Sequence, residues 1–433
     1  MYGGMGEIMV KRVLMIAFHF PPLHGSSGIQ RTLKFAKYLP QHDWEPLVLT
    51  AHPRAYTHTG ADQLLDLPQQ TVVRRAFACD AARHFAILGR YPGWLAQPDR
   101  WVSWAAGAIP AGLRMIRRYR PQIIWSTYPI ATAHLIGHAL HHMTGLPWIA
   151  DFRDPMVDHD YPQDLLTRRL RQGIETRTLQ RCAATVVTTP GVLRRYRERY
   201  PETKCTLIEN GYDESDFEQL PAPHPGAQPF VLLHSGLIYP SERDPGAFLQ
   251  AVGELARDGT LTANRFRVVL RSPGHDDWLK TCIAQHGADG IVEVAPHLGY
   301  REALADMMNA GGLLLLQAAN CNEQIPAKLY EYLRMRRPIL ALIDAGGDTA
   351  ATLRAAGIDT IAPLDSVTEI KHTLLRFVRD AEMGLAPLAK DALIAAYSRS
   401  ALTAQLAELM EEVCYVNAPS TSAPSLRTPW RPE

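Results

Sequence analysis

Cysteine is scarce in this sequence, and long apolar runs are missing from it. The 433 residues include six cysteines, none at C-x-x-C spacing, so we expect reduced thiols rather than a disulfide framework or a structural zinc site. No segment approaches the roughly 18 consecutive apolar residues of a membrane span. Met1 to Val10 also lack the pattern of a signal peptide. We therefore expect a cytoplasmic protein that meets a membrane only peripherally, at its inner face.

Neither sign of charge dominates, and no metal-binding pattern stands out. The formal net charge is +1, which supplies no field that would favour nucleic acid as a partner. None of the 17 histidines lies in an H-E-x-x-H or similar spacing, and we predict no metal ion. Asp158-His159-Asp160 fits a D-x-D metal motif, but loop residues surround it and no strand directly precedes it. We interpret it as a chance match.

Short apolar runs alternate with helical patterns along the chain, which predicts parallel α/β architecture. Arg12 to Phe20 (RVLMIAFHF) opens the series, and after Leu220 to Pro229 it restarts with Phe230 to His234. Four prolines among the ten residues LPAPHPGAQP indicate a connection between domains. The predicted fold class is α/β, with two Rossmann-like doubly wound domains facing a cleft, a favoured place for ligands.

A chain of 433 residues is longer than one hydrophobic core usually serves, which favours two or three domains. The tail, which is rich in Pro, Ser and Thr, is predicted to be disordered. The predicted boundaries are a first domain at 10–215, a linker at 216–229, a second domain at 230–385, C-terminal helices at 386–416 and the tail at 417–433.

The most informative segment is Cys321 to Leu340 (CNEQIPAKLYEYLRMRRPIL), where an apolar strand gives way to a helix. Pro326 suits the first turn of that helix, and the unpaired N–H groups at a helix N-terminus suit a diphosphate. Lys328 adds a positive charge there, while the carboxylates of Glu323 and Glu331 suit sugar and ribose hydroxyls. The alternative is a solvated helix residue at 331 and a loop acid near a helix start at 323.

Glu323 and Glu331 match the E-x7-E motif of glycosyltransferase family 4, which the sequence resembles over most of Lys11 to Ile343. The resemblance implies the GT-B fold and a metal-independent glycosyltransferase with no cofactor, whose co-substrate is a nucleoside-diphosphate sugar. It also implies a glycan or lipid-linked acceptor and retention of configuration, in surface polysaccharide or glycoconjugate biosynthesis. The other similar segments are Phe18 to Thr50 (FHFPPLHGSSGIQRTLKFAKYLPQHDWEPLVLT), Ile149 to Pro155 (IADFRDP), Glu209 to Phe217 (ENGYDESDF) and His234 to Pro245 (HSGLIYPSERDP).

The resemblance further implies a set of donor-binding residues. A glycine loop after the first strand should let backbone approach the diphosphate, although a tight turn would need glycine as well. Many family members carry a Gly-Arg pair and a nearby lysine in the second domain. Here a leucine follows Gly236, so Arg243 or Arg271 is expected to substitute, unless either lies at the surface. The predicted donor-binding residues are Gly25, Ser26, Ser27, Gly28, Gly236, Arg243, Arg271, Ile325, Pro326, Ala327, Lys328 and Glu331.

A short charged segment ends a strand that faces the predicted cleft. Many relatives have a histidine near this point, with which Arg153 aligns roughly. Arg153 would stabilise the departing diphosphate, and Asp154 would hold the acceptor hydroxyl or Arg153 itself. The alternative is an Asp–Arg pair that only shapes the loop. The predicted catalytic residues are Asp151, Arg153, Asp154 and Glu323.

Three further features leave alternatives open. Gly211 is expected to serve a turn where the family crosses between domains, with Asn210 structural. Arg31 faces either the cleft or solvent. Arginine-rich stretches in the first half are typical of solvated helix faces, and they would also suit anionic lipid headgroups. These stretches are Arg114 to Arg120, Arg168 to Arg181 and Arg194 to Arg199.

Rival functions follow from the same residues. A nucleotide-sugar 2-epimerase shares the expected fold, and a non-catalytic nucleotide-binding homologue fits the missing Gly-Arg pair. A dinucleotide-dependent oxidoreductase would need G-x-G-x-x-G after the first strand, which Gly25 to Gly28 does not supply.

Overall fold

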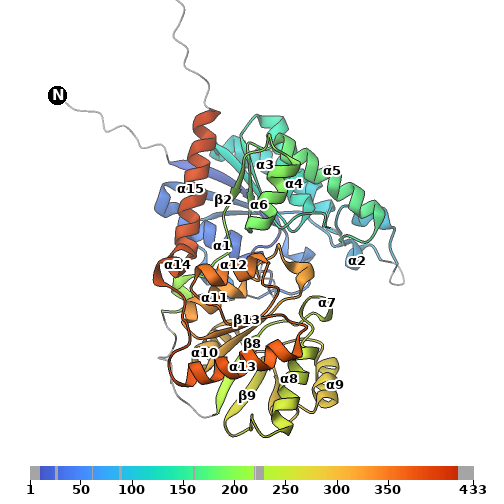
Figure 1. Ribbon diagram of the computed structural model, residues 1–433. Coiled ribbons are helices and arrows are strands. Elements are labelled where there is room, and N and C mark those ends of the chain that lie inside the picture. The colour runs from blue at the N-terminus through green and yellow to red at the C-terminus, as the bar shows by residue number, and fades with distance from the viewer. Residues whose placement is uncertain are drawn as a thin grey trace, which may run out of the picture.

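Two α/β lobes lie one above the other in the computed structural model, each built on a parallel sheet flanked by helices (Figure 1). This arrangement confirms the predicted fold class of two doubly wound domains. Within the described ranges, every helix is too short or too polar to cross a membrane. The described residues are 10–24, 28–60, 62–86, 90–158, 161–218, 220 and 229–417.

In this described part of the chain, seven strands form the first sheet in the order β3-β2-β1-β4-β5-β6-β7. The central strand β1 is apolar on both faces, as a strand covered by helices on both sides requires. The strands are β1 (Lys11–Ile16), β2 (Trp44–Ala51), β3 (Val72–Ala76), β4 (Ile123–Thr127), β5 (Trp148–Arg153), β6 (Ala184–Val187) and β7 (Cys205–Leu207). The helices are α1 (Gly28–Tyr38), α2 (Ala81–His84), α3 (Ser103–Tyr119), α4 (Ala131–Thr144), α5 (Leu165–Arg181) and α6 (Pro190–Arg199).

The second sheet has the strand order β10-β9-β8-β11-β12-β13, again all parallel. Its strands are β8 (Phe230–Ser235), β9 (Phe266–Arg271), β10 (Val292–Ala295), β11 (Gly312–Leu316), β12 (Ile339–Leu342) and β13 (Ile361–Ala362). Its helices are α7 (Pro240–Arg243), α8 (Gly246–Arg257), α9 (Asp276–His286), α10 (Tyr300–Asn309), α11 (Lys328–Met335), α12 (Asp348–Ala355) and α13 (Val367–Glu382). Two C-terminal helices follow, α14 (Asp391–Ala396) and α15 (Arg399–Val416).

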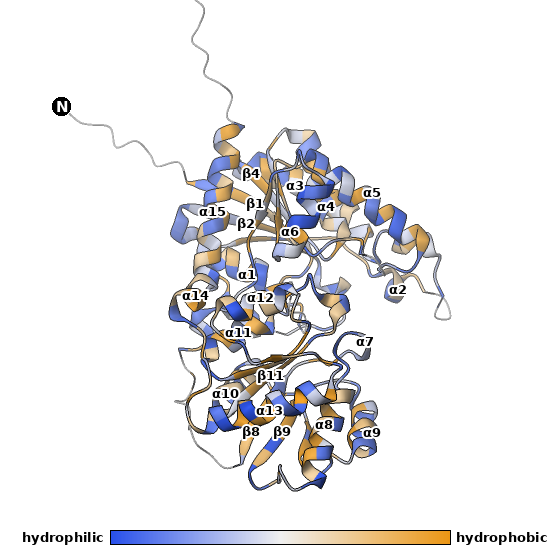
Figure 2. Ribbon diagram, in the orientation of Figure 1, coloured by the Kyte–Doolittle hydropathy of each residue, from blue (hydrophilic) through white to orange (hydrophobic). Residues whose placement is uncertain are grey.

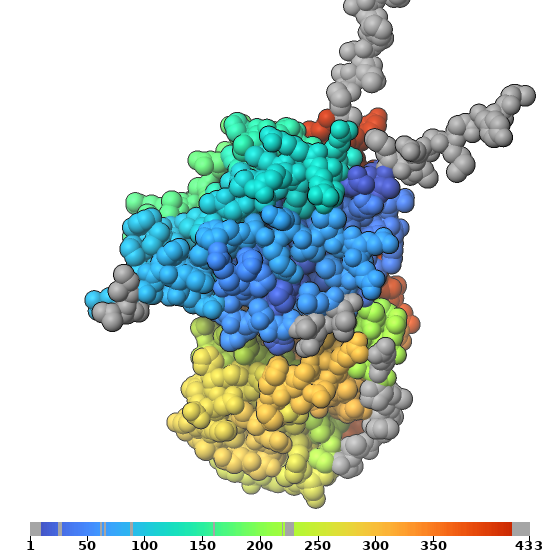
Figure 3. Space-filling model, turned by 180° about the vertical axis from the view of Figure 1, so that it is seen from behind, coloured from blue at the N-terminus to red at the C-terminus, as the bar shows by residue number. Residues whose placement is uncertain are grey.

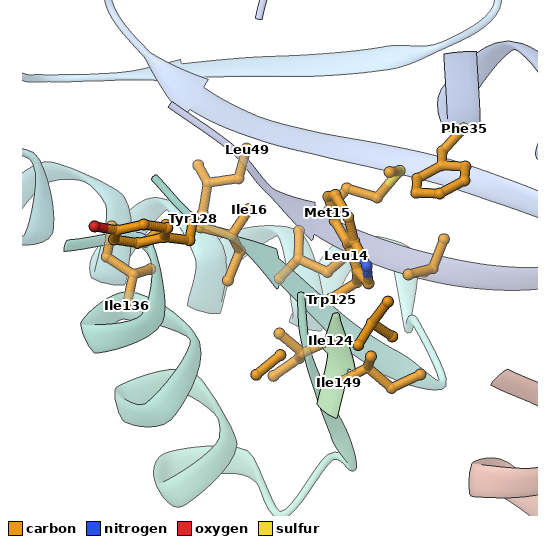
Figure 4. Packing of buried hydrophobic residues seen from close by; sticks show 14 of the residues in the cluster. Leu14, Met15, Ile16, Phe35, Leu49, Ile124, Trp125, Tyr128, Ile136 and Ile149 are labelled. Atoms are coloured by element: carbon orange, nitrogen blue, oxygen red, sulfur yellow. The ribbon is translucent and has the colours of Figure 1, made fainter. Parts of the chain in front are cut away.

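The core of the first lobe lies between its sheet and the flanking helices. Figure 4 shows Met15 of β1 and Trp125 of β4 near Phe35 of α1, and Leu49 of β2 beside Ile16 of β1. In Figure 2 the apolar colour concentrates on the strands inside each lobe, and the helices mix both colours. Each sheet therefore holds its own apolar core, so the two lobes meet mainly through their loops and helix ends.

The first strand is shorter than predicted. β1 ends at Ile16 rather than at Phe20, and two prolines follow at 21 and 22. Phe18 is still buried, because its ring packs 4.8 Å from that of Trp101 and 5.4 Å from that of Tyr56. The apolar character of this stretch beyond Ile16 thus serves packing beside the sheet rather than pairing within it.

The last helix returns to the first lobe. The N–H of Tyr212 donates to Tyr397 O at 3.2 Å, and the N–H of Arg399 donates to Tyr212 O at 2.8 Å. These bonds flank an isolated parallel bridge between Tyr212 and Ser398, where the two segments cross at the waist between the lobes. Figure 3 shows from behind that C-terminal residues, in red, lie against the first lobe and at this waist. Beyond the crossing, α15 buries Leu402, Leu406 and Met410 in the core of the first lobe.

Gly211 lies at this crossing, and its role differs from the predicted turn. A Cβ at Gly211 would lie 2.0 Å from Tyr397 O. Glycine is therefore needed here because the returning segment passes too close to admit a side chain.

Candidate active site

A cavity of about 220 Å³ lies between the lobes, where loops from the two sheets meet. Each lobe contributes one guanidinium to it, Arg153 from the first and Arg243 from the second. The cavity is lined by Arg153, Asp154 and Asn210 on one side and by Glu242, Arg243, Gln317, Cys321, Gln324, Ile325, Pro326 and Ala327 on the other. Five of the predicted site residues beyond Arg153 are thus brought together: Asp154, Arg243, Ile325, Pro326 and Ala327.

Arg153 ends β5 in an unusual backbone conformation. Its φ is 61°, and the register of β5 against β6 shifts between Asp151 and Arg153. A non-glycine residue pays on the order of 1 kcal/mol for this conformation, so the surrounding structure imposes it. Nη1 reaches only two distant acceptors, Gly28 O at 3.4 Å and Tyr128 O at 3.5 Å. Nε is buried and has no hydrogen-bond partner in the described part of the chain.

The neighbouring Asp154 also lines the cavity. Its desolvation in the cleft raises the pKa of the carboxyl, and the positive charge of Arg153 opposes that rise. Opposite charges thus stand next to each other in sequence at the first lobe's side of the cavity.

The glycine loop is only partly described, since Gly25, Ser26 and Ser27 lie outside the described residues. Gly28 begins α1, and a Cβ there would lie 2.4 Å from His19 Nδ1 and 3.1 Å from Arg153 Nη1. Glycine at 28 therefore lets His19 and Arg153 pack directly against the start of the helix.

On the second lobe, Lys328 begins α11, and the imidazole of His234 contacts its ammonium group. Nδ1 of His234 lies 2.9 Å from Leu314 O, so it carries the proton, and Nε2 accepts a hydrogen bond from Lys328 Nζ at 3.1 Å. Gly236, at φ 104°, leaves the space that Nζ occupies, since a Cβ there would lie 3.1 Å away. Burial and the nearby Arg243 lower the pKa of Lys328 to about 7.

The two candidate replacements for the missing Gly-Arg pair lie in different surroundings. Arg243 lines the cavity, and its Nη1 donates to Leu237 O at 2.8 Å. Arg271 forms an ion pair with Asp306 at 2.9 Å and donates to Pro296 O at 3.2 Å. Arg271 is not among the residues that line the cavity. Of the two, only Arg243 is placed to meet a ligand there.

The two glutamates of the E-x7-E motif point to different neighbours. Glu323 forms a short ion pair with Arg195 of α6, in the opposite lobe. Glu331 accepts a hydrogen bond of 2.8 Å from the hydroxyl of Tyr300 on α10. Burial raises the pKa of Glu331, and the bond from Tyr300 opposes the rise. Neither carboxylate is among the residues that line the cavity. The loop before α11 turns Glu323 toward α6, whereas the helix turns Glu331 toward α10. The roles of Glu323 and Glu331 in holding the donor stay predictions.

Asp151 is not among the residues that line the cavity, and its catalytic role stays a prediction. It is fully buried, and both its oxygens accept hydrogen bonds from Arg31, at 2.7 and 3.1 Å. Arg31 also donates to Ile208 O and Glu209 O, at 3.0 and 2.9 Å. This buried pair ties α1, β5 and the start of the crossover together. Asp151 thus lies two residues before Arg153 in β5 and is held there by Arg31.

A set of contacts between α6 and the second lobe, which we call the clasp, closes one side of the cleft. The Asp348 carboxylate accepts from Gly191 N at 2.5 Å and pairs with Arg194 at 3.2 Å. Thr189 Oγ1 donates to Glu323 O at 2.7 Å, beside the Arg195–Glu323 pair. A Cβ at Gly191 would lie 2.7 Å from Asp348 Oδ2 and 2.8 Å from Glu323 Cγ. The clasp consists of Thr189, Gly191, Arg194 and Arg195 on α6 and of Glu323 and Asp348.

A second cavity, of about 260 Å³, lies within the first lobe, and sequence reasoning missed it. Three aromatic rings and three imidazoles line it, because segments after β1 and β2 converge on the loop before α3. His19 lines this cavity and also packs against Gly28, next to Arg153 of the first cavity. Burial and Arg153 lower the pKa of His19 to about 4, so its ring is neutral at pH 7. The lining residues are Phe18, His19, Leu23, His24, Ala55, Tyr56, Thr57, His58, Arg100 and Trp101.

The described residues contain no group of three or more His, Cys, Asp or Glu side chains gathered as metal ligands would be. Of the D-x-D match, Asp158 pairs with Arg195 at 3.0 Å, while His159 and Asp160 lie outside the described residues. Metal independence stays a prediction.

Residues 27–211 match the family model described as a glycosyl transferase 4-like domain. No curated protein sequence gives a significant match. The sucrose-phosphate synthase of Thermosynechococcus elongatus superposes with a TM-score of 0.65 at 14% identity, over 94% of this chain and 100% of that chain. Anabaena HepE in complex with UDP gives a TM-score of 0.61 at 13% identity, over 93% and 100%. The lipopolysaccharide outer core galactosyltransferase WaaB gives 0.59 at 9% identity, over 92% and 99%. These likenesses show that the fold is GT-B.

Proposed function

We propose that this chain, which has the GT-B fold and a glycosyl transferase 4-like domain at 27–211, is a glycosyltransferase that moves a sugar from a nucleoside-diphosphate sugar to a hydroxyl of a glycan or glycolipid. The observation that carries the proposal is the cavity between the lobes, with Arg153 and Arg243 on opposite sides. Guanidinium groups suit phosphate oxygens. HepE, which has the same fold, was solved with UDP and with UDP-glucose.

The proposed reaction retains the configuration of the sugar. The bond from the anomeric carbon to the diphosphate oxygen breaks, and a bond from that carbon to the acceptor oxygen forms on the same face. The acceptor's proton passes to the departing diphosphate oxygen, so that no protein nucleophile is needed. Arg153, Arg243 and Lys328 stabilise the negative charge that builds up on the leaving group. No metal ion or cofactor takes part in the proposed reaction.

The second cavity suits the acceptor. Aromatic faces such as those of Trp101 and Tyr56 stack on the apolar faces of sugar rings, and the imidazoles and Thr57 offer hydrogen bonds to hydroxyls. His19 joins this cavity to the one that holds Arg153. An acceptor seated there would therefore direct a hydroxyl toward the donor.

The proposed membrane contact lies on α5. Three leucines at its start are exposed, Leu165 by 69%, Leu166 by 55% and Leu170 by 40%. Arg168 and Arg169 lie among them. Apolar side chains beside arginines on one helix suit an anionic lipid surface, where a lipid-linked acceptor would be found. Co-sedimentation with vesicles containing anionic lipid tests this, and binding that survives the double change Leu165→Ser and Leu166→Ser would contradict it.

The test of the function begins with nucleotide binding. Five nucleoside diphosphates and their sugars are screened by thermal shift, because a ligand that binds only the folded state raises its stability. The donor that binds is then incubated with glycan and glycolipid acceptors, and NMR of the product reports the anomeric configuration. Conversion of the donor without acceptor would instead identify a 2-epimerase. Binding without turnover against any acceptor would identify a non-catalytic homologue.

A further inference from the structure

The 260 Å³ cavity of the first lobe is lined by basic side chains and by no acidic ones. Among the described residues, no Asp, Glu, Asn or Gln lines it, although carboxylate and amide oxygens are the side-chain groups that best accept from sugar hydroxyls. The cavity between the lobes, by contrast, is lined by two acids and three amides. The polar side chains of the first-lobe cavity are one guanidinium, three imidazoles and the hydroxyls of Tyr56 and Thr57. Its lining therefore presents N–H donors and a positive charge to a ligand.

The guanidinium in this lining belongs to Arg100, which is held in place from two sides. Its carbonyl accepts from the N–H of Ala81 at 2.8 Å. Its guanidinium carbon lies 4.5 Å from the ring centroid of Trp101, which lines the same cavity. That ring is fixed in turn, because its Nε1 donates to Ala55 O at 3.3 Å. A guanidinium positioned in this way loses little freedom when a ligand binds it.

The Arg100 side chain keeps hydrogen-bonding capacity for a ligand. Its Nε lies 3.4 Å from Asp80 Oδ2, yet it makes no hydrogen bond within the described part of the chain. Asp80 is fully buried, its other oxygen accepts from Ala82 N at 3.0 Å, and it is not among the residues that line the cavity. The Arg100 side chain is 38% exposed. A guanidinium offers five N–H donors in a planar fork, which matches two oxygens of one carboxylate or phosphate.

Two of the imidazoles reach the cavity through a pairing of loop segments. The N–H of His24 donates to His58 O at 3.1 Å, and the N–H of Gly60 donates to Pro22 O at 2.8 Å. The segment after β1 thereby lies against the segment after β2, and both His24 and His58 are exposed and line the cavity. An imidazole donates an N–H in either protonation state. These two side chains therefore add donors that suit an anion.

We propose that the acceptor is an acidic sugar, whose carboxylate or phosphate group accepts hydrogen bonds from Arg100 in the first-lobe cavity, with His24 and His58 as further donors. This rests on the proposed function, which seats the acceptor in that cavity, and it adds the charge of the acceptor. A carboxylate and a phosphate both present the paired oxygens that the guanidinium fork binds. A neutral sugar would leave the Arg100 donors without such a partner, so the site should discriminate against it.

The test uses matched sugars and the full chain. The probes are the methyl glycosides of glucose, galactose and mannose, each as the neutral sugar, the uronic acid and the 6-phosphate, and ligand-observed NMR gives each Kd. We expect at least one acidic form to bind about tenfold or more tightly than its neutral parent, and the acid that binds distinguishes carboxylate from phosphate. Arg100→Met should raise the Kd of that acid to the value of the neutral parent. Arg54→Met is the matched control and should leave every Kd unchanged, because the Arg54 guanidinium also lies 4.5 Å from an aromatic ring, that of Phe77, but does not line the cavity.

Equal Kd values for acidic and neutral sugars overturn the inference, and so does a wild type that binds none of the acids. A preference for the acid that survives Arg100→Met overturns it as well. If Arg100→Met does not fold, Arg100→Lys decides instead, since it keeps the charge but not the fork of donors and should bind the acid several-fold more weakly.

Failure of the proposed function would give a different result. In that case the acid binds through Arg100 but receives no sugar from any nucleoside-diphosphate sugar, so the anion site stands and the transferase activity does not. Transfer to neutral sugars at the same rate as to acidic ones would support the proposed function and overturn the inference.

Discussion

The two cavities differ in how they are built. The 220 Å³ cavity takes its walls from both lobes and is lined by two arginines and two acidic residues, whereas the 260 Å³ cavity lies inside the first lobe and is lined mainly by aromatic rings and imidazoles. The first exists only when the lobes come together, and the second does not depend on closure. Donor binding should therefore respond to changes at the contacts between the lobes, and acceptor binding should not.

The largest expected effect comes from Arg243→Met, which removes a cation from the cavity that the lobes share. We expect kcat to fall by about 10²–10³-fold, because a group that stabilises the leaving charge is lost. Arg271→Met provides the comparison, since Arg271 is held by Asp306 away from the cavity. Initial rates with saturating donor give kcat for both variants. Equal losses of kcat in the two variants would contradict a special role of Arg243 at the cavity.

Trp101→Ala should affect only the cavity of the first lobe. Its ring lies 4.8 Å from that of Phe18 and forms part of the lining. We expect the KM for the acceptor to rise roughly 20-fold, while the donor-induced thermal shift stays unchanged. Trp101→Phe, which keeps an aromatic face, should recover most of the affinity. A weakened donor shift in Trp101→Ala would show that the two cavities are not independent.

Gly191→Ala tests the contacts between the lobes directly. The added Cβ would meet Asp348 Oδ2 at 2.7 Å and Glu323 Cγ at 2.8 Å, which forces the clasp apart. We expect donor affinity to fall by about tenfold, with little change in the KM for the acceptor. Gly173→Ala on α5 is the matched control, because nothing lies within 4 Å of its Cβ position. Small-angle scattering should report a larger radius for Gly191→Ala, and an unchanged radius and affinity would contradict the role of the clasp.

The smallest effect concerns pH. Lys328 has a pKa of about 7, lowered by burial and by Arg243, with His234 and Glu331 as its other neighbours. A diphosphate binds the charged form, so affinity should be highest below pH 7 and fall by about fivefold between pH 7 and pH 8 as the protonated fraction declines. Titration calorimetry at several pH values measures this and the proton taken up on binding. Lys328→Met should bind more weakly with a flatter profile, and a profile as steep as the wild type's would assign the titration elsewhere.

The sequence predicted the central strands well and the edges poorly. Central strands are covered on both faces, so that a run such as Leu313 to Leu316 is apolar throughout and recognisable. The edge strand β3 (VVRRA) carries two arginines, and β7 has only three residues, so neither shows a clear pattern. Helix α15 was recognisable as a helix, but its periodicity does not reveal which lobe it covers.

The residues that line the cavity between the lobes were predicted where they are local in sequence, whereas contacts between distant residues were not. The loop from Ile325 to Ala327 and the adjacent Lys328 follow from a strand-to-helix junction, which sequence shows directly. The pairing of Asp151 with Arg31 was not predicted, because Arg31 lies 120 residues away. Long-range pairing of this kind arises from tertiary packing, which no local pattern encodes.

The return of α15 has a consequence for the order in which the protein is made. The buried residues of α15, among them Leu402, Leu406 and Met410, complete an apolar core whose other members precede residue 210. During synthesis the first lobe must therefore wait, with part of its interior uncovered, until the whole second lobe has left the ribosome. A fragment that stops at 215 would keep that surface exposed and is expected to aggregate.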